Sequence, residues 1–341
     1  MKKHLNIPVF IPHIGCPNAC VFCNQRKISG RTGFCIERIR EELNTAFSTI
    51  DGTIPVQIAY FGGSFTGIDR ADMTSLLTIA NEYIEKGKCE SIRISTRPDY
   101  IDREILDILR AYRVGTVELG IQSTDNSVLK ASKRGHTAED SFRASALVKE
   151  YGFELIGQMM AGLPLSSPEK ERQTALDIVS MGADGARIYP AVVFDETELA
   201  DMMKNGIYEP LTTEESAKRA ANILSVFLEY DIPVIRIGLQ AGETLISGDG
   251  VLAGGYHPAV GELAYALYFR RAIEKQLEHT ETTGKMLTVF VHPSDVSKTV
   301  GQKGMNKEYF INIYNLAGFR VIPDGNLKKN QCRIDLHPRI K

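Results

Sequence analysis

Three cysteines near the amino terminus form the pattern in this sequence whose chemistry is easiest to recognise. Cys16, Cys20 and Cys23 follow one another at the spacing C-x3-C-x2-C. Soft thiolate ligands at this spacing suit a [4Fe-4S] cluster, because three sulfurs hold three irons and the short loop offers no fourth ligand. The remaining iron can then bind a small molecule, and the task of the protein is to position that molecule.

A structural zinc site is the alternative interpretation of the same loop. Structural zinc takes four protein ligands, and the nearest further candidates are His13 and Cys35. Cys35, Cys89 and Cys332 are otherwise scattered along the chain, which is typical of free thiols in a reducing compartment. The motifs farther along the chain decide between the two interpretations.

Length and composition indicate a globular protein with one large and one small domain. The chain has 341 residues, and its apolar fraction of 43% is sufficient for a substantial core. No stretch approaches the roughly 18 uninterrupted apolar residues that span a bilayer, and the first four residues lack the apolar block of a signal peptide. We therefore expect a cytoplasmic protein without a membrane partner.

Charge is distributed unevenly along the chain. The net charge is −2, but the ten Lys/Arg and four Asp/Glu residues from Lys285 onward give that segment +6 and leave −8 for the remainder. A basic segment on an acidic body is expected when one end of a protein contacts phosphate. A solvated basic tail is the alternative interpretation.

Strand-like runs alternate with helical patterns over the first 240 residues. Helix start signals occur at Ser167-Pro168 and at Thr212-Thr213-Glu214-Glu215. The alternation predicts an α/β fold, with a parallel sheet and helices outside it. The predicted strands are 55–61, 91–95, 116–121, 153–159, 185–189 and 233–237, and the predicted helices include 36–47, 101–112 and 138–151.

Polar residues and glycines follow these strands at their carboxyl ends, where parallel β/α folds place reactive groups. Glycines let a ligand approach the backbone, hydroxyl and amide groups can bond a ribose or carboxylate, and a guanidinium can hold a carboxylate through two parallel bonds. An ordinary turn or a surface charge is the alternative at each position. The candidate ligand-binding residues are Gly62, Gly63, Ser95, Thr96, Gln122 and Arg134.

The cysteine spacing, with Phe22 directly before the last cysteine, resembles that of the radical SAM superfamily. The resemblance implies that the open iron binds S-adenosylmethionine and that reduction of the cluster splits the carbon–sulfur bond to release an adenosyl radical. It also implies a partial (β/α)6 barrel over residues 1–240, an electron donor such as a reductase, flavodoxin or ferredoxin, and contacts of Phe22, Met159 and Tyr189 with the cofactor.

Further motifs make the resemblance more specific. Together they look like the radical SAM half of the Elongator catalytic subunit, over roughly the first 210 residues. That resemblance implies modification of the wobble uridine of transfer RNA with an acetyl-CoA-derived group. The motifs are Phe61-Gly-Gly-Ser-Phe-Thr66, Thr96-Arg-Pro-Asp99, Val117-Glu-Leu-Gly-Ile-Gln-Ser123, Lys133-Arg-Gly-His-Thr137, Met160-Ala-Gly-Leu-Pro164 and Arg187-Ile-Tyr-Pro190.

Two departures from that family limit what the resemblance implies. Its members continue into an acetyltransferase domain, for which this chain has no room, and only 15 residues precede Cys16, where the family has a basic arm. A carboxymethyl product is therefore in doubt, and acyl chemistry would require a partner that supplies the acyl donor.

A glycine-rich segment and a connecting helix are expected over residues 241–284. Within it, His257 and Glu262 are candidates for the substrate side of the site, either as a proton-transfer pair or as substrate ligands. The alternative is a turn that leads into a helix over 259–277, with Glu262 as a charge in its first turn.

The last segment, 285–341, has the order strand, helix, G-x-x-G, helix, strand. This order resembles a KH module, whose loop lets a single-stranded backbone approach while lysine neutralises phosphate. We expect Gly301, Gln302, Lys303 and Gly304 to contact RNA.

Three functions are consistent with these patterns. The first is a radical SAM transferase that modifies RNA, with transfer RNA as the favoured substrate. The second is a radical SAM enzyme that acts on a small molecule or peptide, with the basic segment serving in assembly. The third is a non-catalytic RNA-binding sensor that uses the iron–sulfur cluster.

Overall fold

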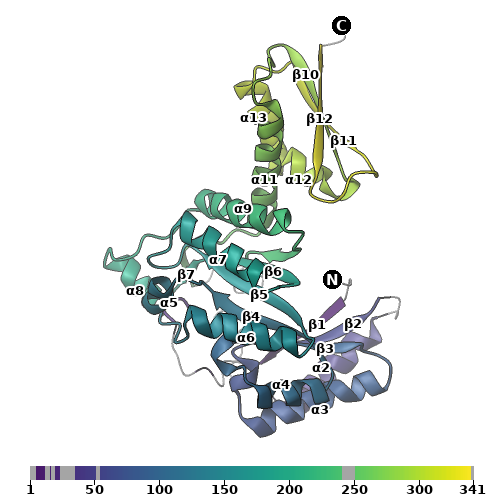
Figure 1. Ribbon diagram of the computed structural model, residues 1–341, viewed down its shortest axis with the longest axis vertical. Coiled ribbons are helices and arrows are strands. Elements are labelled where there is room, and N and C mark those ends of the chain that lie inside the picture. The colour runs from purple at the N-terminus through teal and green to yellow at the C-terminus, as the bar shows by residue number, and fades with distance from the viewer. Residues whose placement is uncertain are drawn as a thin grey trace.

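The chain folds into a large body and a small C-terminal module that one long helix connects (Figure 1). The structure is a computed structural model that describes residues 5–11, 16, 20–23, 35–50, 54–239 and 250–338. Within these ranges, no helix is long and apolar enough to cross a membrane.

The large body is built on a seven-stranded sheet whose strands lie in sequence order and pair in parallel. Its order is β1-β2-β3-β4-β5-β6-β8, and the terminal strands β1 and β8 do not pair with each other. The sheet is thus an open, partial barrel, as predicted. Its strands are β1 (Leu5–Ile11), β2 (Val56–Gly62), β3 (Ser91–Thr96), β4 (Val114–Gln122), β5 (Glu154–Ala161), β6 (Gly185–Pro190) and β8 (Val234–Ile237).

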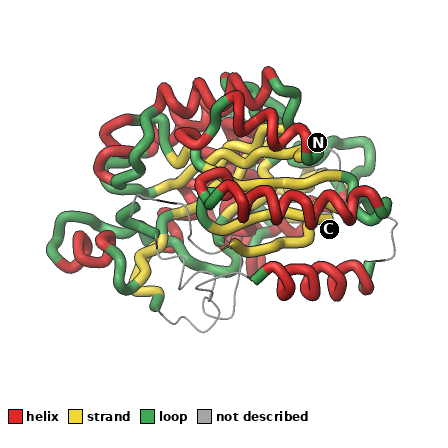
Figure 2. Tube along the Cα trace, turned by 90° about the horizontal axis from the view of Figure 1, so that it is seen from below, coloured by secondary structure: helices red, strands yellow, loops and turns green. Residues whose placement is uncertain are grey.

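Helices cover the outer side of the curved sheet (Figure 2). The predicted helix starts are confirmed: the Ser167 side chain accepts a hydrogen bond from the Lys170 amide, and Thr212 and Glu215 form a capping box. The helices of the body are α2 (Ile36–Ser48), α3 (Arg70–Glu85), α4 (Arg103–Ala111), α5 (Asn126–Ala131), α6 (Ala138–Glu150), α7 (Pro168–Ser180), α8 (Glu198–Lys204) and α9 (Thr213–Glu229), with 3-10 turns η1 (Phe65–Gly67) and η2 (Pro98–Tyr100).

Strand β1 is one strand more than the six that the sequence predicts. Its sequence contains Pro8, which cannot donate a backbone hydrogen bond and which argues against a central strand. The structure places β1 at the edge of the sheet, where proline is tolerated.

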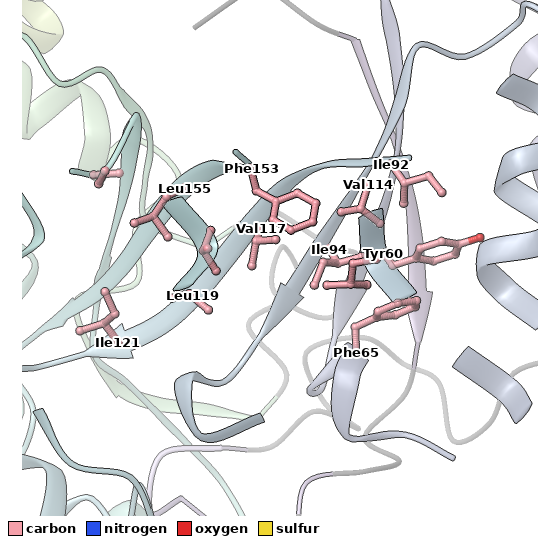
Figure 3. Packing of buried hydrophobic residues seen from close by; sticks show 14 of the residues in the cluster. Tyr60, Phe65, Ile92, Ile94, Val114, Val117, Leu119, Ile121, Phe153 and Leu155 are labelled. Atoms are coloured by element: carbon pink, nitrogen blue, oxygen red, sulfur yellow. The ribbon is translucent and has the colours of Figure 1, made fainter. Parts of the chain in front are cut away.

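The main core lies between the sheet and the outer helices (Figure 3). Aliphatic side chains from β3, β4 and β5 fill it, and the rings of Tyr60 and Phe65 stack with centroids 5.0 Å apart. Tyr60 is fully buried, and its hydroxyl donates to the carbonyl of Leu76 at 2.6 Å. Burial of each large apolar side chain contributes about 1.5–3 kcal/mol, so this layer holds the helices on the sheet.

A two-stranded antiparallel ribbon extends from the body. It consists of β7 (Val192–Phe194) and β9 (Val251–Gly254). Helix α8 follows β7 and packs against it. The ribbon precedes the long helix α11 (Val260–Leu277), which leads to the C-terminal module.

The C-terminal module has a sheet of its own, in the order β11-β10-β12. The predicted order of strand, helix, G-x-x-G, helix and strand is present, and an additional strand, β12, pairs antiparallel with β10. The core of the module includes Phe269, Ile273 and Leu277 of α11, so it begins before residue 285. Its elements are β10 (Lys285–Val291), η3 (Pro293–Asp295), α12 (Val296–Val300), η4 (Gln302–Gly304), α13 (Met305–Ile313), β11 (Gly318–Pro323) and β12 (Cys332–Pro338).

Replacing Gly62 by alanine should destabilise the body strongly, because a Cβ atom at this position would lie 1.9 Å from the carbonyl oxygen of Ile11 in β1. Gly87 is the matched control, since it also has a positive φ, +69°, but a Cβ atom there would meet nothing within 4 Å. We expect Gly62→Ala to lower the free energy of unfolding in urea by more than about 3 kcal/mol, against about 1–2 kcal/mol for Gly87→Ala. An equal loss of unfolding free energy in the two variants would show that β1 can move away from the added Cβ atom without destabilising the body.

Candidate active site

The described part of the cysteine loop is fastened by backbone bonds to the C-terminal end of α5 and to α8. The amide of Val21 donates to the carbonyl of Ser132 at 3.2 Å, and the amide of Leu199 in α8 donates to the carbonyl of Val21 at 2.8 Å. The side chain of Val21 is buried in a small apolar cluster with Leu199 and Tyr208, and Phe22 packs against that cluster. Phe22 therefore anchors the loop in this structure.

Two buried guanidinium groups contact cysteine sulfurs. Nη1 of Arg97 donates to Sγ of Cys16 at 3.7 Å, and Nη1 of Arg134 donates to Sγ of Cys20 at 3.4 Å. Arg97 and Arg134 are only 3% and 8% exposed, so the charge of each acts in surroundings that screen it weakly. A buried cation needs a negative partner, and thiolates can supply one.

Asp99 holds Arg97 from the side opposite the cysteine. Nε and Nη2 of Arg97 donate to the two carboxylate oxygens of Asp99 at 2.9 and 2.8 Å. Burial works to lower the pKa of Arg97, but the bond and charge of Asp99, followed by the charges of Cys16 and Cys20, outweigh it and raise this pKa. Arg97 stays charged beside the cysteine loop.

His136 completes this group as a neutral side chain. Its Nε2 lies 3.2 Å from the carbonyl oxygen of Ile121 and its Nδ1 lies 3.9 Å from Oδ1 of Asp99. Burial, and then the charge of Arg134, lower the pKa of His136 to about 4. The imidazole is therefore uncharged at neutral pH and donates from Nε2 to the backbone.

The residues predicted at the ends of β3 and β4 do lie around this group. The Thr96 hydroxyl is bonded to the hydroxyls of Ser64 at 2.8 Å and Thr66 at 2.6 Å, so it ties β3 to the turn after β2. Gln122 has a left-handed backbone, with φ +65°, and its buried Oε1 has no protein partner among the described residues. A bound molecule with a donor group could satisfy that oxygen.

Glycines leave room for neighbouring groups at two positions around the site. Gly120 is one of them, because a Cβ atom there would lie 2.8 Å from Nη2 of Arg134, which donates to the Gly120 carbonyl. Gly62 is the other, because of its contact with β1, and the amide of Gly63 donates to Ile11 of the same strand at 3.4 Å. The predicted glycines thus shape the end of the sheet.

The concave side of the sheet carries a network of charged side chains centred on Glu118. Arg93 and Arg187 donate to Oε1 of Glu118 at 2.8 and 2.9 Å, and Gln158 donates to Oε2 at 2.6 Å. The predicted ligand Ser95 also donates to Oε2, at 3.3 Å. Because Glu118 is fully buried, leaving this carboxylate without its partners would cost about 3–5 kcal/mol.

Two further predicted cofactor contacts have different outcomes. Tyr189 lies at the end of β6. Burial raises the pKa of its hydroxyl, although the charge of the neighbouring Arg187 works to lower it. Met159 is fully buried in the main core, on the helix-covered side of β5. Its assignment is wrong in orientation, because successive side chains of a strand point to opposite faces, and Met160 has the concave-side position.

His257 and Glu262 have local structural roles in this fold. Nδ1 of His257 accepts a hydrogen bond from the Ala259 amide at 3.0 Å, which shapes the turn before α11. Glu262 is exposed in the first turn of α11. Among the described residues no hydrogen bond or ion pair joins the two, and their catalytic assignment remains a prediction; much of the preceding glycine-rich segment, residues 240–249, lies outside the described ranges, as does His13.

Sequence reasoning missed how the charged residues are connected. Arg97 and Asp99 stand in one short run of the sequence, which was a signal of their pairing, but nothing in the sequence relates them to His136 or to the individual cysteines. The network of Glu118, Arg93 and Arg187 was also missed, because a charged residue in a buried strand has no sequence signature for its partner.

The donor set suits an iron–sulfur cluster. Three cysteines and two buried guanidiniums against the sulfurs surround one end of the sheet, together with the buried atoms Arg134 Nε and Gln122 Oε1, which have no hydrogen-bond partner among the described residues. In the described residues, no group of three His, Cys, Asp or Glu side chains is arranged to hold a metal ion, so the structure shows the framework for the ligands without a closed metal-binding geometry.

Comparison with known proteins identifies the class to which this fold and site belong. The family model for the radical SAM superfamily matches residues 10–178, and the model for the radical SAM C-terminal domain matches residues 183–268. The chain therefore belongs to the radical SAM superfamily, whose members use a [4Fe-4S] cluster and S-adenosylmethionine. The expected cluster and cofactor are thereby confirmed, while ligation of the cluster by Cys16, Cys20 and Cys23 stays a prediction.

Curated relatives are similar to somewhat more than half of the chain. One is the tRNA uridine(34) acetyltransferase of Methanocaldococcus infernus, 33% identical over 53% of this chain and 33% of the relative. Another is the protein of that name from Methanocaldococcus jannaschii, 30% identical over 62% of this chain and 38% of the relative. Elongator complex protein 3 of Mus musculus is 29% identical over 55% of this chain and 34% of its own length.

The chain spans little more than a third of the length of these relatives. A solved structure of Methanocaldococcus infernus Elp3 with an N-terminal deletion has the same fold, with a TM-score of 0.63 and 24% identity over 80% of this chain and 63% of that one. The expected resemblance to the Elongator catalytic subunit is thereby confirmed.

The low pKa of His136 makes stability depend on pH. In the unfolded chain this histidine is protonated below about pH 6.5, whereas in the folded protein it stays neutral down to about pH 4. The free energy of unfolding therefore falls as the pH falls from about 6.5 to about 4. Urea denaturation should show this group lowering the free energy of unfolding by about 1.4 kcal/mol per pH unit there. His136→Gln should lose that part of the slope, and an unchanged slope would show that the buried imidazole does not resist protonation.

Proposed function

We propose that this protein cleaves S-adenosylmethionine reductively at a [4Fe-4S] cluster and uses the resulting radical to modify RNA, with transfer RNA as the substrate. The observation that supports an RNA substrate is the G-x-x-G loop, which carries an exposed lysine and is held on the helix that joins the module to the body. Membership of the radical SAM superfamily supports the catalytic part.

Within the body, the proposal assigns a task to each group at the carboxyl end of the sheet. Cys16, Cys20 and Cys23 ligate the cluster, which, once bound, supplies an electron to S-adenosylmethionine. The cofactor is held by the ends of β2, β3, β4 and β6. Gln122 Oε1, which has no partner in the described part of the chain, fits a donor such as an amino or ribose hydroxyl group. The remaining residues that hold S-adenosylmethionine in the proposal are Gly62, Gly63, Ser95, Thr96 and Tyr189, and Arg134 contacts the cluster ligand Cys20.

The G-x-x-G loop presents its backbone and one lysine to solvent. Gly301 has φ +76° and Gly304 has φ +79°, and Lys303 between them also has a left-handed backbone, with φ +52°. Gln302 and Lys303 are exposed, and the Cβ position of Gly304 meets open space. Such a loop lets a phosphodiester backbone approach closely while an ammonium group neutralises one phosphate.

The loop is fixed to α11 by a buried asparagine. Nδ2 of Asn306 donates to the carbonyls of Ala266 in α11 at 2.8 Å and of Thr299 at 3.0 Å, while its Oδ1 accepts from Nε of Arg270 at 3.0 Å. The guanidinium of Arg270 also lies over the ring of Tyr309, 4.0 Å from its centroid. These contacts hold the start of α13, and with it the loop, against α11.

Helix α11 connects this loop to the body, because it packs both against α9 of the body and against α12 of the module. Ala264 of α11 belongs to the main core, whereas Phe269 and Ile273 belong to the core of the module. An RNA bound at the loop would therefore have a defined position relative to the cysteine loop. This supports a role of the module in presenting substrate.

The names of the relatives favour transfer RNA among RNA substrates. Two of them are called tRNA uridine(34) acetyltransferase, and the chain spans only about a third of each. We propose that the radical step is carried out here, with a reductase, flavodoxin or ferredoxin as electron donor and with any acyl donor bound by a partner.

Cofactor cleavage is the first test. Anaerobically reconstituted protein with a strong reductant should convert S-adenosylmethionine into 5′-deoxyadenosine and methionine, as measured by chromatography and mass spectrometry. Cys20→Ser should abolish turnover, because it removes a cluster ligand, while Cys332→Ser in the module should retain it. A chain that carries the cluster and binds the cofactor without consuming it would instead be a sensor.

Lys303→Gln tests the RNA contact. We expect binding to a transfer RNA transcript, measured by fluorescence anisotropy, to weaken about tenfold at low salt and the slope of log K against log salt to fall by about 0.7, the value for one lost phosphate contact. The control is Lys275→Gln, which should bind as the wild type does. Lys275 is exposed and lies nine residues beyond Ala266, and thus about 14 Å farther along α11. Equal binding by both variants would favour a small-molecule or peptide substrate.

A further inference from the structure

We propose that Arg97 and Arg134 form a cationic pair that raises the reduction potential of the cluster, and that Asp99 is the positioning residue that directs Arg97 at Cys16. This inference rests on the part of the proposed function in which the three cysteines ligate a [4Fe-4S] cluster. It assigns the two arginines to the sulfur side of the site.

The contacts of Arg97 leave only one of its nitrogens free for the cysteine. The carboxylate of Asp99 occupies Nε and Nη2 in a bidentate pair, at 2.9 and 2.8 Å, so Nη1 remains, and this nitrogen donates to Sγ of Cys16 at 3.7 Å. The fork of a guanidinium is planar and rigid. Fixing one edge of the fork therefore fixes the direction of the third nitrogen.

Arg134 is oriented by the backbone instead of a carboxylate. Its Nη2 donates to the carbonyl of Gly120 at 2.8 Å, and its Nη1 donates to Sγ of Cys20 at 3.4 Å. Gly120 permits this arrangement, since a Cβ there would lie 2.8 Å from Nη2 of Arg134 and 3.0 Å from Nε2 of Gln122. Among the described residues, Arg134 has no ion pair with a carboxylate within 4.0 Å.

The charges around the sulfurs consequently have a positive surplus. Arg97 and Arg134 contribute two positive charges, Asp99 contributes one negative charge, and His136 is neutral because burial lowers its pKa to about 4. Asp99 is about one quarter exposed, whereas both arginines are almost fully buried. Water therefore screens the carboxylate more than it screens the guanidiniums.

A positive surplus beside the sulfurs favours reduction of the cluster. Reduction adds one electron, and the negative charge is shared by the thiolate sulfurs, so nearby cations and N–H donors stabilise the reduced form more than the oxidised form. Hydrogen bonds to the sulfurs are an established means of tuning the potential of such clusters. The two arginines supply such bonds to Cys16 and Cys20.

The test measures the midpoint potential of the cluster in the reconstituted full chain, by redox titration followed by electron paramagnetic resonance, without RNA or S-adenosylmethionine. We expect Arg97→Gln and Arg134→Gln each to make one-electron reduction about tenfold less favourable, which corresponds to about 59 mV. The control is Arg103→Gln, an exposed arginine paired with Glu150, whose potential should match the wild type. Coinciding potentials in all four proteins would overturn the inference.

Asp99→Asn separates positioning from charge alone. If Asp99 acted only through its charge, removing that charge would make the potential more positive. If it directs Arg97 at Cys16, the released guanidinium turns away and the potential becomes more negative, as we expect. A positive shift would overturn the positioning role.

Assembly is checked by iron and sulfide content in every variant. If a glutamine variant loses the cluster, the lysine variants Arg97→Lys and Arg134→Lys keep a charge but lack the fork, and their potentials should lie below the wild type. Lysine variants at the wild-type potential would count against the inference. A wild-type chain that takes up no cluster would instead refute the proposed function, so the two failures are distinguishable.

Discussion

The carboxylate of Glu118 connects four neighbouring strands on the concave side of the sheet. It accepts hydrogen bonds from Arg93 of β3, Gln158 of β5 and Arg187 of β6, and it is fully buried. A partial barrel encloses a space that apolar side chains do not fill, so its interior can hold charges only when they are paired. The pairing around Glu118 satisfies this condition and joins the middle of the sheet.

The alternation of side chains along each strand then divides the body into two chemical layers. On the outer side, residues such as Ile94, Leu119 and Met159 form an apolar layer beneath the helices. On the inner side, the polar residues of the same strands lead toward the carboxyl ends, where the arginines meet the cysteine loop. The apolar layer provides stability, while the polar layer provides the orientation that the chemistry requires.

Sequence patterns were sufficient for most of the architecture. Six strands, two capped helix starts and the loop of residues 301–304 were found because each has a local signal, such as an apolar run or an N-cap residue. Strand β1 was missed because Pro8 weakens its signal, and β12 was missed because its alternating polar residues resemble a solvated tail.

The site was harder to predict than the fold for two physical reasons. In β5, Met159 and Met160 are adjacent and identical in type, and only the polar side chains of Glu154 and Gln158 mark the inner face that Met160 shares. The contact between Arg97 and Cys16 joins residues 81 positions apart, and only the folded sheet brings them together. Residue types could therefore be listed in advance, but their partners could not.

Pro8 also affects how the molecule meets its neighbours. In β1, the Leu5 amide donates to the carbonyl of Pro55, the residue before β2, and the Ile11 carbonyl accepts from Gly63, the residue after β2. The backbone N–H and C=O groups of odd-numbered residues therefore face β2, and the nitrogen of Pro8 faces outward. Among the described strands, none pairs with β1 on this side. A foreign strand that approached this edge would find a donor missing at its centre, and templated association with other polypeptides is disfavoured there. Pro8 thus helps to prevent aggregation of the open barrel through its edge strand.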